Sequence, residues 1–282
     1  MTPGLRAARW ASGIVTNPYL DLTRQFNQGR LRALVSSGQA VVLHRLAIMS
    51  KDGDWVLRED DETMHHVLSV LAEHGARYRF GAPLDVRWLS GGWSAHLEHT
   101  GSGLRLRTDF VSRPPRVSAS ELDAMWRAAE ASGADVVPLE PLAAMKLTKR
   151  EKDYAVLGEL ARRMADPRSQ LRYSRSSHDL ARLAADHPGA LAATLRVRPL
   201  LAHVARGRDV LDAELDRERR MLMRADETRL ARYRDAATRW AAIWPDVSRQ
   251  IEGLGLRDAH RIVVARAAGA LPTEAAGGDT DG

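Results

Sequence analysis

The alternation of apolar and polar residues in the first half of the chain predicts short β-strands. Residues 104–112 alternate strictly between two faces: Leu104, Leu106, Thr108 and Phe110 on one, and Arg105, Arg107 and Asp109 on the other. Residues 93–99 precede them across a Thr-Gly-Ser-Gly stretch, so the two segments are expected to form a hairpin. Further strands are expected just before Ser36, from Asp52 onward, and over 83–89.

Apolar spacings of three and four residues predict helices between these strands and throughout the second half. In the first half, helices are expected from Asp21 to about Leu34, from about residue 60 to His74, over 118–132, and from near Pro141 through Asp153. Beyond about residue 160 only helical patterns appear, including a long charged one over 209–244. The predicted fold class is therefore α+β, followed by an all-α C-terminal part.

This change of pattern divides the chain into four expected parts. They are an N-terminal extension at 1–29, an α+β domain at 30–160, a helical domain at 161–267, and a tail at 268–282. The tail consists mainly of Gly, Ala, Thr and Asp, and we expect it to be disordered.

Composition limits the class of protein further. Cysteine is absent, which excludes disulfides and thiolate metal sites. No apolar run approaches the ~18 residues that a membrane helix needs, and the N-terminus lacks the apolar core of a secretory signal. We therefore expect a soluble, cytoplasmic protein without membrane contact. The formal net charge of +6 is compatible with a nucleic-acid or nucleotide partner, and equally with an ordinary basic surface.

The Asp52-Gly53-Asp54 stretch is the strongest candidate for chemistry. In a strand, residues two apart point to the same side, so both carboxylates would lie on one face. Two like charges held this close need a cation between them, or one of them must bind a proton. Their hard oxygen ligands suit a divalent ion. The alternative is a plain turn, because Asp-Gly is a common hairpin signal.

Other residues complete a set suited to nucleotidyl transfer. Asp109 provides a third carboxylate on a strand face, with an ion pair to Arg105, Arg107 or Arg87 as the alternative. The Ser36-Ser37-Gly38 turn leaves backbone N–H groups open to a phosphate. Downstream, the basic side chains able to bind phosphates are Lys146, Arg150 and Lys152.

Together these residues resemble the DNA polymerase beta-type nucleotidyltransferase superfamily. Its motif is a Gly-Gly or Gly-Ser turn, a gap of about a dozen residues, an Asp-x-Asp or Asp-x-Glu pair, and a third acid on a later strand. Here the turn is Ser36-Ser37-Gly38, the pair is Asp52 and Asp54, and the later acid is Asp109. The segment from Met145-Lys146 to Arg150-Glu151-Lys152-Asp153 resembles a helix of the minimal and AbiEii-type members, some of which are toxins.

The resemblance covers about residues 30–160 and implies a mixed-sheet nucleotidyltransferase domain. It implies that Asp52, Asp54 and Asp109 act as catalytic and metal-binding residues for Mg²⁺ or Mn²⁺. It further implies a nucleoside triphosphate substrate, an acceptor such as an RNA or tRNA end, a protein or a small molecule, and, for toxin-like members, an antitoxin partner. The turn here contains Ser-Ser-Gly, and Gly53 replaces the usual apolar residue between the acids. These departures leave open an inactive module that binds nucleotide, RNA or protein.

The histidines His65, His66 and His74 raise the question of a second metal site. His65 and His66 are adjacent, so they point apart on a helix, and no further His or Cys follows at ligand spacing. We therefore expect ordinary helix-surface positions for them.

Overall fold

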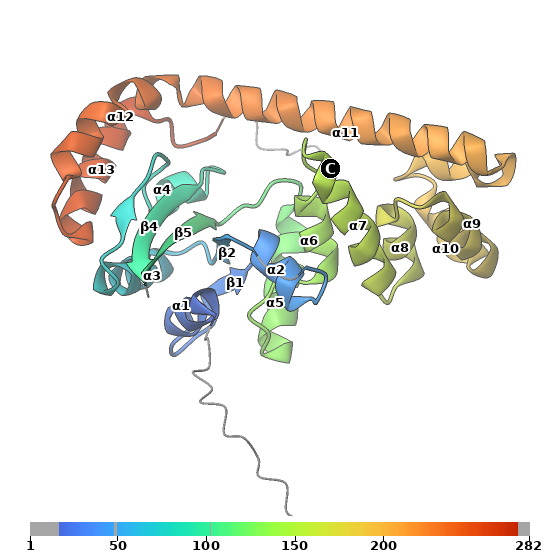
Figure 1. The fold of residues 1–282 in the computed structure, drawn as a ribbon, viewed down its shortest axis with the longest axis horizontal. Helices are drawn as coiled ribbons and strands as arrows, with labels where there is room; N and C mark the ends of the chain where they lie inside the picture. Colours follow the sequence, from blue (N-terminus) through green and yellow to red (C-terminus); the bar gives the residue numbers. More distant parts are fainter. Residues whose placement is uncertain (1–16, 48–49, 102, 276–282) are drawn as a thin grey trace, which may run out of the picture.

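The fold is built around a mixed, five-stranded sheet in the order β1-β2-β5-β4-β3. The computed structural model describes residues 17–47, 50–101 and 103–275. The strands are β1 (Ala33–Val35), β2 (Asp52–Leu57), β3 (Arg77–Tyr78), β4 (Ala95–Gly101) and β5 (Leu104–Val111). β2 and β5 run parallel, and the other neighbouring pairs run antiparallel. The expected α+β class is confirmed (Figure 1).

The two faces of the sheet differ because side chains alternate along each strand. One face presents Trp55 and Phe110, whose stacked rings have centroids 5.3 Å apart, to the largest core of the molecule. Helices α1 (Pro18–Phe26) and α3 (Asp61–Glu73) cover this face. The opposite face carries Asp52, Asp54 and Asp109. It is therefore the face on which the candidate site lies.

A second core begins where the polar face becomes apolar, at Val56 of β2 and Leu34 of β1. Three helices pack there: α5 (Ala119–Ser132), α6 (Leu139–Met145) and α7 (Glu151–Arg163). The short helix α2 (Ser37–Leu43) follows β1 directly and also contributes to this core. The arrangement brings the α6–α7 connection next to β2.

The described residues after α7 are mainly helical, as expected. A third core joins α8 (Pro167–Tyr173), α9 (Ser177–Asp186), the 3₁₀ segment η1 (Pro199–Arg206) and the start of α11 (Arg208–Ala236), with α10 (Pro188–Thr194) beside it. The long helix α11 then runs along the molecule to α12 (Thr238–Ile251) and α13 (Leu256–Ala270) (Figure 1). Trp240, Val247 and Val263 of these last helices belong to the same core as Trp55.

The end of the described chain is attached to the sheet domain. Residues 268–270 complete α13, and Leu271 is buried. The indole N–H groups of Trp88 and Trp93 donate to the carbonyls of Leu271 and Pro272 at 3.2 and 2.8 Å. The amide of Ala275 donates to the Gly91 carbonyl. Order thus extends to residue 275 of the segment expected to be a disordered tail, while 276–282 lie outside the described residues.

Several local predictions are confirmed. The hairpin appears as β4 and β5, and the helices expected at 60–74 and 118–132 appear as α3 and α5. Asp60 caps α3, and Ser118 and Glu121 form a reciprocal capping box on α5. No helix within the described ranges is both long enough and apolar enough to cross a membrane.

Three element predictions are wrong, and side-chain hydrogen bonds explain each. The helix expected to reach Leu34 ends at Phe26, because the Asn27 side chain accepts from the amides of Arg32 and Ala33 and turns the chain. The strand expected at 83–89 is the short helix α4 (Val86–Leu89), capped by Asp85. The single helix expected through Asp153 is broken between α6 and α7, where Asp153 accepts from Thr148.

Candidate functional site

Strand register brings the candidate acids together at the centre of the polar face. β2 and β5 are parallel neighbours, with Asp54 opposite Asp109 and Asp52 opposite Arg107. Because paired residues in adjacent strands project from the same face, the Asp54 and Asp109 side chains stand beside each other. Asp52 lies two residues back on the same face. Asp54 and Asp109 are half-buried.

The neighbouring carboxylates affect the pKa of Asp54. Burial raises the pKa of Asp54 to about 7, and the neighbouring charges of Asp109 and Asp52 add to the rise. Lys146 acts in the opposite direction but does not cancel it. The charged form of Asp54 is therefore disfavoured by burial first and by its neighbours second, and a bound cation or proton would relieve this cost.

Lys146 is the basic residue whose charge acts most strongly on Asp54. It caps α6 and is almost fully buried, with its Nζ 3.8 Å from the Asp153 carboxylate. Burial lowers the pKa of Lys146, whereas Asp153 and Asp54 act to raise it. The lysine is thus paired with Asp153, and its charge also acts on the Asp54 carboxylate.

The other basic residues of this segment are placed differently. Arg150 donates through Nε to the Asp153 carboxylate at 2.8 Å and is half-exposed. Lys152 is exposed on α7. The backbone amide of Lys149 donates to Asp226 of α11 at 2.8 Å. The loop carrying Lys146 is therefore fixed from two sides, by α7 and by α11.

The Ser36-Ser37-Gly38 turn lies beside Asp54, where β1 leads into the first residues of α2. The amide of Ser36 donates to the Asp54 carbonyl at 2.8 Å. Ser37 has a φ of 50°, in the left-handed region that non-glycine residues rarely adopt. A Cβ on Gly38 would come within 2.3 Å of the Ser50 Oγ, so glycine is needed for this close approach.

Packing beneath the acid pair explains Gly53. A Cβ there would lie 2.4 Å from a ring carbon of Tyr19 and 2.5 Å from one of Trp55. The Tyr19 hydroxyl donates to the Lys51 carbonyl at 2.6 Å, which holds its ring in place. The rings of Tyr19 and Trp55 thus fill the space that a side chain at residue 53 would occupy. This explains why glycine stands where the family pattern has an apolar residue.

Asp109 has partners that the sequence did not reveal. Its Oδ1 accepts from Arg79 at 3.2 Å and lies 2.8 Å from the Nδ1 of His96. The alternative partners considered for Asp109 are wrong. Arg105 pairs with Glu98, Arg87 pairs with Asp85, and Arg107 lies 3.9 Å from Asp52. His96 is directly opposite Asp109 on β4, and this pairing is visible only once the hairpin register is known.

A series of close polar contacts continues from Asp109 to the long helix. The Nε2 of His96 lies 2.9 Å from the Ser94 Oγ. The Tyr233 hydroxyl of α11 lies 3.1 Å from both the Oγ and the amide nitrogen of Ser94. Ser94 immediately precedes β4, and its hydroxyl lies within hydrogen-bonding distance of the ring of His96, the second residue of that strand. Four side chains, from β5, β4, the residue before β4 and α11, thus form one connected series, which ends at the third acid.

The donor chemistry of the acids suits a hard divalent cation. Asp52 and Asp54 offer carboxylate oxygens on one face, and a bound cation would favour the charged form of Asp54, whose pKa is raised by burial and then by the neighbouring carboxylates. Asp109 is adjacent, but Arg79 and His96 engage its carboxylate. Within the described residues, no three His, Asp or Glu side chains are close enough to hold one ion together. The structure therefore fits a pair of ligands more readily than a closed set of three.

A large cavity lies near the site, but Asp52, Asp54 and Asp109 do not line it. It has a volume of about 840 Å³ and lies between α5, α11, the 113–118 segment and the end of the described chain. Its wall includes Arg116, Arg229 and Tyr233. Both arginines are paired with the buried Asp226.

Comparison with known proteins identifies no family. No family model matches the chain, and no curated protein matches it. A "putative nucleotidyltransferase from H. pylori" of known structure is 15% identical, with a TM-score of 0.34 over 75% of this chain and 96% of that one. The structure of JHP933 from Helicobacter pylori is 14% identical, with the same TM-score over 75% of this chain and 93% of that one. At this level, neither alignment bears on function.

Proposed function

We propose that this protein is a metal-dependent nucleotidyltransferase, which moves a nucleoside monophosphate from a nucleoside triphosphate to an acceptor hydroxyl. The observation that carries the proposal is the register of β2 and β5. It places Asp52 and Asp54 beside Asp109 on one face, next to the β1–α2 turn and the buried Lys146. The buried carboxylate of Asp54, whose charged form burial disfavours, is the feature that a bound cation would stabilise.

Each group has a separate part in the proposed reaction. Asp52 and Asp54 would hold Mg²⁺ or Mn²⁺, which supplies positive charge to the phosphates when bound. Asp109 would complete the shell or accept the proton of the attacking hydroxyl. The acceptor oxygen forms a bond to the α-phosphorus, and the bond to the leaving pyrophosphate breaks. Lys146, helped by the Ser36-Ser37-Gly38 turn, Arg150 and Lys152, would bind the phosphates.

The resemblance extends the proposal to an acceptor and a partner. An RNA or tRNA end is the acceptor class it favours, with a protein or small-molecule hydroxyl as alternatives, and an antitoxin protein is the implied partner. A second candidate function is a nucleotide-, RNA- or protein-binding module without transfer activity. The engagement of Asp109 by Arg79 and His96 favours this candidate, because both groups compete with a metal for its carboxylate.

The test is transfer of label from α-labelled nucleoside triphosphates to total RNA and to protein. We expect Asp52→Asn and Asp54→Asn each to lower transfer by at least about 100-fold, since each removes charge stabilisation at the reacting phosphate. Asp235→Asn changes an exposed acid of α11 and serves as the matched control. Wild-type protein that binds triphosphate but transfers no label would support the binding module. Full activity in both site variants would exclude the proposed site.

A further inference from the structure

His99 is a buried imidazole without a hydrogen-bond partner. It lies in β4 and is only 6% exposed. Neither of its ring nitrogens has a partner within the described residues. A neutral imidazole carries one N–H donor and one acceptor lone pair, and burying both without partners is costly. An external group that binds one of the ring nitrogens would therefore remove part of this cost.

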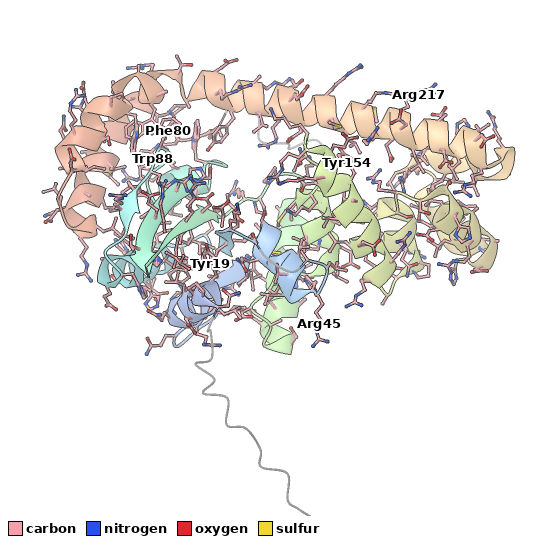
Figure 2. The ribbon with its side chains drawn as sticks, in the orientation of Figure 1. Tyr19, Arg45, Phe80, Trp88, Tyr154 and Arg217 are labelled. Atoms are coloured by element: carbon pink, nitrogen blue, oxygen red, sulfur yellow. The ribbon has the colours of Figure 1, made fainter. Side chains whose placement is uncertain are left out.

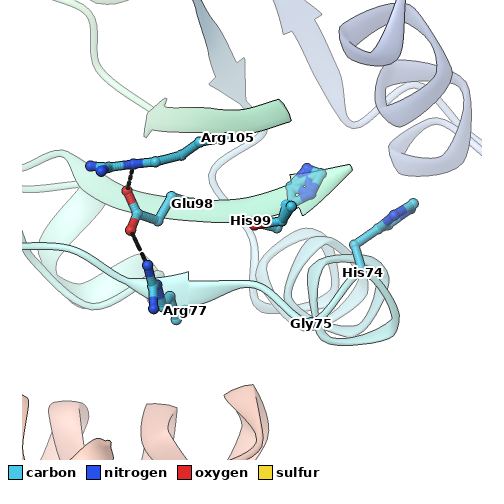
Figure 3. Close-up of a pocket in the computed structure, with 7 residues that line it drawn as sticks. His74, Gly75, Arg77, Glu98, His99 and Arg105 are labelled. Carbon is cyan, nitrogen blue, oxygen red and sulfur yellow. Dashed lines mark hydrogen bonds and ion pairs between the residues drawn. The ribbon is translucent and has the colours of Figure 1, made fainter. Parts of the chain in front are cut away.

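A hollow of about 210 Å³ adjoins His99 and opens at the edge of the sheet (Figure 3). His74, at the end of α3, also lines it, and the His74 and His99 ring centroids lie 5.3 Å apart. The two histidines are 25 residues apart in the sequence, so spacing along one helix could not reveal the pair. His74 is exposed and would leave the hollow open to small solutes.

His74 is oriented as metal-binding histidines commonly are. Its Nε2 lies 2.9 Å from the side-chain oxygen of Gln25 in α1. Donation of the Nε2 proton to this oxygen leaves a lone pair on Nδ1, as the outer partners of metal ligands typically arrange.

The spacing of the rings suits a shared ion. Two imidazoles that bind one tetrahedral ion, with metal–nitrogen distances of about 2.0–2.1 Å, place their centroids about 5 Å apart. Glu98 bridges Arg77 and Arg105 on the other side of the hollow (Figure 3). Glu98 precedes His99 in the strand, so its ion pairs form on the opposite face of β4. The single carboxylate offsets only one of the two guanidinium charges.

We propose that His74 and His99 form a binding site for a divalent transition-metal cation such as Zn²⁺, which ties the end of α3 to β4. Imidazole nitrogen is a preferred ligand of Zn²⁺, Ni²⁺ and Cu²⁺, and a poor one for Mg²⁺. Two coordination positions remain for water or a small anion. This site is separate from the carboxylates of β2 and β5, and it does not depend on nucleotidyl transfer.

The test is titration of the metal-free full-length protein with Zn²⁺, followed by calorimetry and by the unfolding temperature. We expect one saturable Zn²⁺ that raises the unfolding temperature. Co²⁺ should give the visible spectrum of a nitrogen-ligated ion, and Mg²⁺ should not compete. His74→Ala and His99→Gln should abolish this binding. Gln25→Ala should weaken it by roughly tenfold, because the outer partner is lost.

The controls separate this site from the rest of the molecule. His65→Ala removes an exposed histidine of the same helix and should leave binding unchanged. Asp54→Asn should also retain it, whether or not the protein transfers nucleotides. His74→Ala decides the matter if His99→Gln does not fold, because His74 is exposed. No saturable Zn²⁺ binding in the wild type, or equal binding in His74→Ala, would overturn the proposal.

Discussion

Asp54 is the residue at which burial and two neighbouring carboxylates act on one side chain. Its ordinary pKa of 3.8 rises to about 7 in the folded protein. Between these values the folded state binds a proton that the unfolded state has released. Stability therefore falls as pH rises through this window, and the loss is complete above about pH 7. The same charge that would bind a cation thus destabilises the metal-free protein.

Asp54→Asn should remove this loss. In the presence of EDTA we expect the variant to be more stable than the wild type at pH 8 by about 1–3 kcal/mol, and nearly equal at pH 4. Adding Mg²⁺ should stabilise the wild type and not the variant. Denaturant unfolding at the two pH values measures the difference. Equal stability at pH 8 would show that the site carries no excess charge.

The role of Gly53 looks different in the sequence and in the structure. In the sequence it appears as a departure from the family pattern and a reason to question the acid pair. In the fold, the rings of Tyr19 and Trp55 occupy the space its side chain would need. Periodicity could not show this, because Tyr19 approaches from a helix that is more than thirty residues away in the sequence.

At the scale of elements, the sequence predicted those helices and strands whose formation depends on residues close together in the chain. The β4–β5 hairpin and the capped helices α3 and α5 follow from alternation, turn residues and caps near in sequence. The same local patterns identified Asp52, Asp54 and Asp109 as candidate site residues. The partners of Asp109 could not be predicted from the sequence, because Arg79, His96 and Asp109 meet only through the pairing of β3, β4 and β5. The break before α7 likewise depends on Asp153 and on Asp226 of α11.

The connection between α11 and the third acid makes a prediction at this scale. Tyr233→Phe removes the hydroxyl that contacts Ser94, and so loosens the series that orients His96 and Asp109. A lost hydrogen bond of about 1 kcal/mol corresponds to about a fivefold fall in kcat. The KM for the triphosphate should stay unchanged. Steady-state kinetics of label transfer measures both constants.

The matched control for this variant is Tyr78→Phe. Its hydroxyl accepts from the Leu84 amide and lies 2.7 Å from His260, in a buried position outside the series. We expect a comparable loss of stability with unchanged kcat. Equal kcat effects in the two variants would mean that Tyr233 acts only through general stability.

At the scale of the whole molecule, the C-terminal helices are part of the framework of the site. α11 extends from the third core to the sheet domain, and α12 and α13 then pack against the largest core (Figure 2). Along its length α11 holds the Lys146 loop through Asp226, and it contacts Ser94 through Tyr233. The sequence indicated helices here, but not that they return to the sheet, because apolar spacing does not specify a partner.

Locating Mn²⁺ by anomalous diffraction, in crystals grown with a non-hydrolysable nucleoside triphosphate analogue, tests the central claim most directly. Mn²⁺ shares the oxygen preference of Mg²⁺ and scatters anomalously, so it marks the ion's position. The account predicts a peak between the carboxylates of Asp52 and Asp54, with the triphosphate extending toward Lys146. Nucleotide bound elsewhere, or no Mn²⁺ peak at Asp52 and Asp54, would contradict it.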